Sequence, residues 1–167
     1  MNSFWPDGLS IDDTQPPYEV LQIAREEWEL KSAGALTLIL QKAESESGYA
    51  MIIVHAKHVV SNRTATLLSV IHRPNEPYPA TIQPRKEELP DILKRSHYEP
   101  GFGEIAMSMS GQGRTVENEW VSDTPSELRK KLSKAFNLSS VKTAILSLAS
   151  DVSSDTSKDE GRAAQDE

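Results

Sequence analysis

Three successive stretches of the chain carry the hydrophobic pattern of β-strands. They span residues 35–42, 49–57 and 63–72. In the first stretch, Leu36, Leu38 and Leu40 fall on one face, which is the two-residue period of a half-buried strand. The second stretch is apolar on both faces at residues 51–54, so we expect it to be central and covered on both sides. The short connections favour antiparallel neighbours, because a parallel crossover needs roughly a dozen residues or more.

The chain is less regular after the third stretch. Residues 73–79 contain three prolines, and we expect a rigid loop there. A short edge strand should follow at residues 80–83, because Pro84 ends it. Self-association through this edge is one expectation, since an unpaired strand is a template for a second chain.

The segment up to the last helices is the hardest to interpret. Residues 86–95 have the composition of a short helix, interrupted by Pro90. Residues 104–110 and 115–121 have the pattern of a second hairpin. Residues 85–101 as a whole do not reveal a structure or a role.

Before the strands, residues 18–32 have helical spacing. The apolar stripe of this helix consists of Val20, Leu21, Ala24 and Trp28. Pro16 and Pro17 suit the start of the helix, where an N–H group is not needed. Gly34 is suited to close it, because glycine accepts the left-handed backbone of a helix C-terminus.

Two further helices are predicted after the strands. Thr124 is a strong N-cap residue, followed by a proline and, three positions on, by Glu127. Asn137 should end this helix, and Ser139 or Ser140 should begin the last one. The inward side chains are expected to be Leu128, Leu132, Ala135 and Phe136 in the first, and Val141, Ala144, Ile145 and Leu148 in the second.

This order of elements predicts an α+β fold, because strands grouped between helices argue against a wound parallel sheet. We expect an antiparallel sheet of about five to six strands, with an N-terminal helix and two C-terminal helices. Three regions follow from the pattern: an ordered N-terminal arm at residues 1–17, a single domain at 18–149, and a Ser/Asp-rich tail at 150–167. The composition of the tail predicts disorder.

Composition narrows the classes of function. The net charge is −7, of which the tail at residues 150–167 carries −4, so charge alone does not indicate nucleic-acid binding. The chain has no cysteine, which excludes disulfides, thiolate nucleophiles and cysteine-ligated metals. No secretory signal pattern is visible, and no apolar run reaches the roughly 18–20 residues of a membrane span. These features predict a cytoplasmic protein without a membrane contact.

The histidines give only a weak signal for chemistry. His55 and His58 are three residues apart near a strand and should point to opposite faces, and His72 ends the next strand. The carboxylates that could join them at a metal are Glu44, Glu46 and Glu76. The chain lacks HExxH, a catalytic Gly-x-Ser-x-Gly turn and a complete phosphate-binding glycine loop. We therefore expect no catalytic residue, no cofactor and no metal ligand.

Basic residues gather in the last two predicted helices and suggest an alternative function. They are Arg129, Lys130, Lys131, Lys134 and Lys142. Two short helices with a tight turn are typical of a helix-turn-helix that binds nucleic acid. However, the second helix offers mostly Ser, Thr and Ala outside its apolar stripe, whereas base recognition favours Arg, Asn or Gln. A solvated helix face explains the same pattern.

Aromatic residues outside the helices are the best candidates for contacts with a partner. The arm contains Phe4, Trp5, Leu9 and Ile11, and Trp5 could also join the arm to a second copy of the chain. Tyr78 lies in the proline-rich segment. Trp and Tyr often anchor protein interfaces, so we assign Trp5 and Tyr78 as candidate partner contacts.

The sequence favours a small, non-enzymatic protein-binding module, such as an adaptor, chaperone, inhibitor or immunity-type partner. Its acidic body would steer association with basic partners. The first alternative is a nucleic-acid-associated protein that uses the basic face at residues 129–142. The second is an enzyme whose site is spread over several strands. The sequence names neither a partner nor an oligomeric state.

Overall fold

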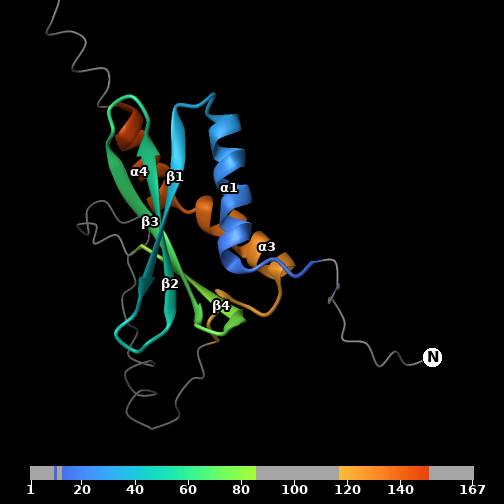
Figure 1. Cartoon of the computed structure of the whole chain (residues 1–167). Coiled ribbons are helices and arrows are strands. Elements are labelled where there is room, and N and C mark those ends of the chain that lie inside the picture. The colour runs from blue at the N-terminus through green and yellow to red at the C-terminus, as the bar shows by residue number, and fades with distance from the viewer. Residues whose placement is uncertain (1–9, 11–12, 86–116, 151–167) are drawn as a thin grey trace, which may run out of the picture. The chain divides into compact units, whose positions relative to one another are not determined.

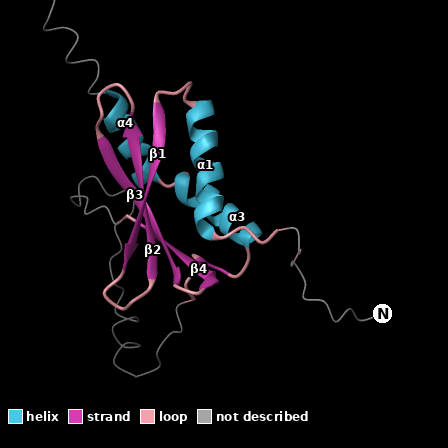
Figure 2. Cartoon of the chain, viewed as in Figure 1, coloured by secondary structure: helices cyan, strands magenta, loops and turns pink. Residues whose placement is uncertain are grey.

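The computed structural model describes residues 10, 13–85 and 117–150. Within them, five strands form one antiparallel sheet, accompanied by one helix before the strands and two after them (Figures 1 and 2). The strands follow one another across the sheet in chain order. This confirms the predicted α+β fold. All of these elements belong to one compact unit, which is built from residues up to 85 and from 120 onward. Residues 117–119 belong to a second unit.

The elements have the following bounds. The helices are α1 (Pro17–Lys31), α3 (Pro125–Phe136) and α4 (Ser139–Ser150). The strands are β1 (Leu36–Glu44), β2 (Ala50–His58), β3 (Thr64–Arg73), β4 (Glu76–Pro84) and β5 (Val121–Ser122). The predicted helix at 86–95 and the strand at 104–110 lie outside the described residues. Of the predicted strand at 115–121, the structure describes residues 117–121, and among these Val121 alone is in a strand, because the chain turns just before it.

Helix α1 ends as its sequence predicts. The N–H of Gly34 donates to the carbonyl of Glu29 at 2.8 Å, and Gly34 has a φ of +81°. A side chain at this φ would be strained, which is why glycine suits the position. The hydroxyl of Ser32 bonds both the N–H and the carbonyl of Leu36, at 3.0 Å each, and so fixes the entry into β1.

Helix α3 starts at the predicted cap. The N–H of Glu127 donates to the hydroxyl of Thr124 at 3.2 Å, and Pro125 takes the first helical position. The carboxylate of Glu127 reaches back to the N–H of Asp123 at 2.9 Å. These bonds satisfy donors that a helix N-terminus otherwise leaves unpaired.

One face of the sheet builds the core together with the helices. Its buried apolar side chains are Leu38, Ile52, Val54, Ala56, Leu68, Val70, Ala80 and Ile82. Helix α1 contacts β1, α3 contacts β4 and β5, and α4 contacts β2 and β3 (Figure 2). On the opposite face Met51 and Ile53 are half-buried. Strand β2 is therefore central as predicted, but the expected burial of both its faces is wrong.

A β-bulge in β3 increases the number of buried leucines. Leu67 and Leu68 are consecutive, yet each is only 1% exposed, which a regular alternation does not allow. Val54 pairs with Leu68 and His55 pairs with Thr66, so Leu67 is an extra residue in β3. The bulge turns both leucines toward the core.

The rigid loop predicted at residues 73–79 is wrong. Arg73 pairs with Glu76 in a tight hairpin, and β4 begins there. The register then shifts, so that residues 77–79 have no partner on β3. Two of these three residues are prolines, and the shift places them where the ladder needs no N–H donor.

The predicted edge strand at residues 80–83 is also corrected. These residues lie within the longer strand β4, and β5 pairs with Ala80 and Thr81 on the side away from β3. In the described part of the chain, β1 and β5 form the edges of the sheet. Pro84 is the last residue of β4, as predicted, whereas Pro77 and Pro79 lie in the stretch that has no partner on β3.

Candidate functional site

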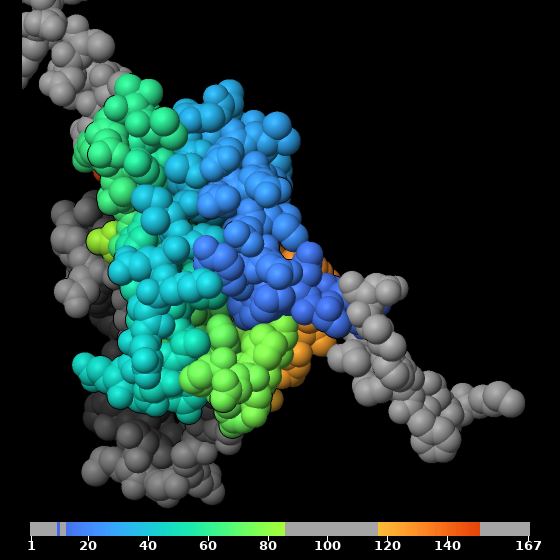
Figure 3. All heavy atoms as spheres, viewed as in Figure 1, coloured from blue at the N-terminus to red at the C-terminus, as the bar shows by residue number. Residues whose placement is uncertain are grey.

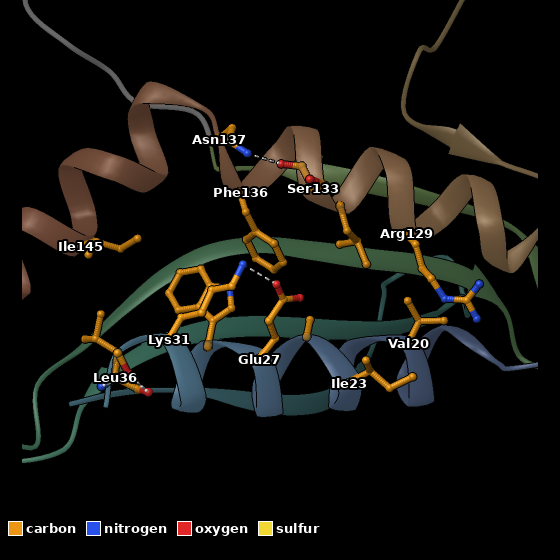
Figure 4. Close-up of a pocket in the computed structure, with 14 residues that line it drawn as sticks. Val20, Ile23, Glu27, Lys31, Leu36, Arg129, Ser133, Phe136, Asn137 and Ile145 are labelled. Carbon is orange, nitrogen blue, oxygen red and sulfur yellow. Dashed lines mark hydrogen bonds and ion pairs between the residues drawn. The ribbon is translucent and has the colours of Figure 1, made fainter. Parts of the chain in front are cut away.

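An open groove of about 460 Å³ runs between α1 and α3, with α4 closing one end (Figure 4). Arg129 and Val20 lie at one end, and Phe136, Leu36 and Ile145 lie at the other. Two rigid helices frame the groove, so its shape is set by the fold rather than by a loop. It is the best-defined candidate site in the described residues.

Both walls of the groove follow from helical spacing. The wall from α1 presents Val20, Ala24 and Trp28, which are four residues apart. The wall from α3 presents Leu132 and Phe136 with the same separation. Val20 and Leu132 are each only 3% exposed and belong to the core as well, whereas Trp28 and Phe136 are half-buried.

An aromatic pair forms the floor. The rings of Trp28 and Phe136 meet edge to face, with centroids 5.2 Å apart and planes at 62°, which is a favourable arrangement for aromatic pairs. Both side chains remain half-buried. Ile23 lies at the rim with 45% exposure, so the groove offers apolar surface from floor to edge.

The two helices that frame the groove carry opposite net charge over their whole length. Helix α1 contains four glutamates against two basic residues, whereas α3 contains one glutamate against four basic residues. On the α1 rim, Lys31 pairs with Glu27 at 2.7 Å (Figure 4). On the α3 rim, the side-chain amide of Asn137 donates to the carbonyl of Ser133 at 2.9 Å. The charged side chains that line the groove itself are Glu27, Lys31 and Arg129, and each of them is paired: Lys31 with Glu27, and Arg129 with Asp13.

Arg129 connects the groove to the N-terminal arm. Its guanidinium donates to both carboxylate oxygens of Asp13, at 2.8 and 2.7 Å, and to the side-chain oxygen of Gln15 at 2.5 Å. The hydrogen bonds from Arg129 lower the pKa of Asp13, against a smaller opposing effect of burial. The same contact raises the pKa of Arg129. A bidentate pair of this kind also fixes the orientation of the guanidinium relative to the carboxylate.

Tyr78 supports the same contact from the sheet. Its hydroxyl donates to the carbonyl of Gln15 at 2.9 Å. Burial, more than the opposing charge of Arg129, raises the pKa of Tyr78 to about 12. Tyr78, a candidate partner contact from the sequence, is thus half-buried against the arm. The other candidate, Trp5, lies outside the described residues.

The predicted basic face does not form one uniform patch. Arg129 pairs with Asp13, Lys131 donates to the carbonyl of Val121, and the ammonium of Lys134 lies 5.3 Å from the ring centroid of Trp120. These three cations therefore contact the domain itself. Lys130 and Lys142 are exposed.

The histidines stand apart from one another. His58 is buried on the core face, while His55 lies on the opposite face, as predicted. His55 contacts the hydroxyl of Thr66 at 3.0 Å and the side-chain oxygen of Gln41 at 3.1 Å, which makes a polar chain across three strands. In the described ranges, no three His, Asp or Glu side chains are placed to hold a metal ion.

A second hollow, of about 650 Å³, lies by the β1–β2 and β3–β4 turns. Tyr49, Met51 and Ile71 contribute apolar surface, and His72 lies at its border. The Nδ1 of His72 is 2.7 Å from the carbonyl oxygen of Arg73. Because a carbonyl only accepts, Nδ1 carries the proton. The described lining of this hollow comes from the β1–β2 turn and from strands β2, β3, β4 and β5 rather than from helices.

Sequence reasoning missed two parts of the groove. Ile23 is an apolar residue outside the apolar stripe of α1, and this isolated apolar position is the feature of the sequence that indicates a second contact surface on the helix. Asp13 and Gln15 carried no local signal, because their partner Arg129 is more than a hundred residues away. Trp28, which belongs to the predicted apolar stripe of α1, packs against the core and also lines the groove.

Comparison with models of protein families, with curated proteins and with solved structures found no match to this chain. Among the helices that the structure describes, none combines the length and the apolar character needed to cross a membrane. The site must therefore be interpreted from its own geometry and charge.

Proposed function

We propose that this protein is a binding module that receives an amphipathic helix of a partner protein in the groove between α1 and α3. The half-exposed Trp28–Phe136 pair is the observation that carries this proposal. Aromatic side chains that remain accessible in a concave site are typical anchors of binding. A groove between two helices suits the recognition mode in which a helix lays its apolar face between them.

The dimensions support a helical occupant. The lining of α1 extends from Val20 to Lys31, which corresponds to roughly 17 Å at about 1.5 Å per residue. A helix of three turns has the same length. Such a helix would place apolar side chains at i, i+3 or i+4, and i+7 against the groove.

The charges support one orientation of the occupant. Its flank along α1 should be basic, because that helix is net acidic, and its flank along α3 should be acidic, because that helix is net basic. A helix inserted the other way round would place like charges together, which disfavours it. The absence of cysteine fits a reducing compartment, and we propose that the module acts in the cytoplasm without catalysing a reaction.

The test is selection from a displayed library of random peptides of about 15 residues, which is enough for four turns. We expect selected peptides to share the apolar spacing, with basic residues on one flank and acidic residues on the other. Ile23→Glu should weaken their binding about tenfold or more, since about 1.4 kcal/mol corresponds to one factor of ten.

Ile39→Glu is the matched control. Ile39 is 37% exposed on the opposite face of the sheet, close to the 45% of Ile23. Binding that survives Ile23→Glu and is lost with Ile39→Glu would contradict the assignment to the groove. Selection of peptides without helical spacing would also contradict it.

A further inference from the structure

We propose that the N-terminal arm, residues 1–12, occupies the α1–α3 groove of its own chain and competes there with the partner helix. The competition rests on the proposed function, whereas the occupancy of the groove does not. Three observations favour the arm: the place where it joins the domain, its reach and its composition.

The arm joins the domain at the mouth of the groove. Asp13 and Gln15 are held by Arg129, and Arg129 itself lines the groove beside Val20 (Figure 4). The carbonyl of Gln15 also accepts from Tyr78. This junction is thus fixed by side chains from both α3 and β4. The arm therefore leaves the domain next to the end of the groove that Arg129 lines.

The reach of the arm exceeds the length of the groove. The N–H of Asp13 donates to the carbonyl of Ser10 at 3.1 Å, so the chain turns there. An extended chain advances about 3.3–3.6 Å per residue, so the nine residues before Ser10 span roughly 30 Å. The groove is roughly 17 Å long by the rise of α1. Phe4 and Trp5 stand five or six residues before Ser10, which is roughly 17–20 Å of extended chain, and they can therefore reach the aromatic floor.

The composition of the arm matches the groove. The arm contains four apolar side chains that would cover the half-buried aromatic floor: Phe4, Trp5, Leu9 and Ile11. Asp7 and Asp12 are the acidic residues among the first twelve, and their charge is opposite to the net charge of α3. These are the same features that the proposed partner helix would use, except for the helical spacing.

Occupancy within one chain is favoured over exchange between two copies. A segment tethered next to its site has an effective concentration on the order of millimolar. A second copy reaches that concentration only in very concentrated solution. The fixed junction at Asp13 adds to this advantage, because it removes much of the arm's freedom before the contact forms.

The test uses the full chain with one nitroxide label. Because the sequence contains no cysteine, Ser3→Cys provides a single attachment point. Backbone NMR signals of Ser133 and Ile145, which line the groove, should lose intensity when the label is active. Gly48, in the β1–β2 turn, should keep its intensity and serves as the control.

Two further measurements decide the result. When labelled chains without isotope are mixed with isotope-labelled chains without nitroxide, the loss at Ser133 should disappear; a persistent loss would show that a second copy is the occupant and overturn the proposal. Changing Phe4, Trp5, Leu9 and Ile11 together to serine should abolish the loss in the singly labelled chain. No loss at Ser133 and Ile145 in the unmodified arm would also overturn it.

Failure of this proposal is distinguishable from failure of the proposed function. The nitroxide experiment contains no partner, so it reports the arm alone. If the arm occupies the groove, the serine variant of the arm should bind the selected peptides more tightly than the unmodified chain. Equal peptide binding by both would show that arm and peptide do not compete.

Discussion

Asp13 and Arg129 lie 116 residues apart in the chain and are joined by two hydrogen bonds from one guanidinium to one carboxylate. The pair ties the segment before α1 to the first turns of α3. Arg129 also lines the groove between α1 and α3, so the pair lies at the end of that groove.

We expect Asp13→Asn to lower the free energy of unfolding at neutral pH. The folded-state pKa of Asp13 lies below its ordinary value of 3.8, mainly because of the hydrogen bonds from Arg129. A depressed pKa gives a contribution that is present above pH 3.8 and is lost as the pH falls through the folded-state pKa. The difference between the two proteins should thus shrink in acid, as measured by urea denaturation at several pH values.

Arg129→Gln and the double variant complete this test. If the pair acts as one unit, the effect of both changes together should be smaller than the sum of the single effects. Strict additivity would show that Asp13 and Arg129 contribute independently. Lys130→Gln, next to Arg129 and exposed, is the control for loss of a positive charge.

The pKa of Tyr78 predicts a specific loss of stability in alkali. Burial raises it to about 12, against an ordinary value of 10.0. The unfolded chain therefore releases this proton first, and stability contributed by the neutral phenol is complete below pH 10 and is lost toward pH 12. Tyr78→Phe should flatten this part of the pH profile. A spectroscopic titration that places every tyrosine near pH 10 would contradict the prediction.

Ser122 should tolerate loss of its hydroxyl. It is fully buried in β5, and among the described residues its Oγ has no hydrogen-bond partner. A buried hydroxyl without a partner costs about 1–3 kcal/mol. We expect Ser122→Ala to leave stability unchanged or to raise it by about 1 kcal/mol, as measured by thermal and urea denaturation. Ser47→Ala, exposed in a turn, is the control, and a clear destabilisation by Ser122→Ala alone would reveal a bound partner of the hydroxyl.

Lys130 and Lys142 distinguish protein binding from nucleic-acid binding. Both are exposed, whereas Arg129, Lys131 and Lys134 contact the domain. If the basic face binds nucleic acid, affinity should fall steeply with salt, and Lys130→Glu with Lys142→Glu should reduce the salt dependence. We expect instead no salt-dependent binding to a DNA duplex or to single-stranded RNA. Binding of either that is lost in the double variant would favour the alternative function.

Local signals in the sequence were sufficient for much of the fold. The cap at Thr124, the turn glycine at Gly34 and the alternation in β1 each act over a few residues. A helix cap or a strand period depends on neighbouring residues, so the chain alone reveals it. The α+β order followed directly from these elements.

The prediction of a loop at residues 73–79 was wrong because of the prolines in β4. Their missing N–H groups argue against a strand, but a register shift in the pairing with β3 makes those donors unnecessary. A shift of this kind is a property of two paired strands, and neither strand encodes it alone. The bulge at Leu67 has the same origin.

The sequence by itself determined the kinds of element, their order and most of the apolar faces, because these depend on interactions within one turn or one strand. Only the tertiary structure decided that Trp28 meets Phe136, that Arg129 holds Asp13 and that Lys131 and Lys134 contact their own domain. Each of these contacts joins segments far apart in the chain. Their geometry depends on how the helices settle on the sheet, and that arrangement minimises exposed apolar area over the whole domain.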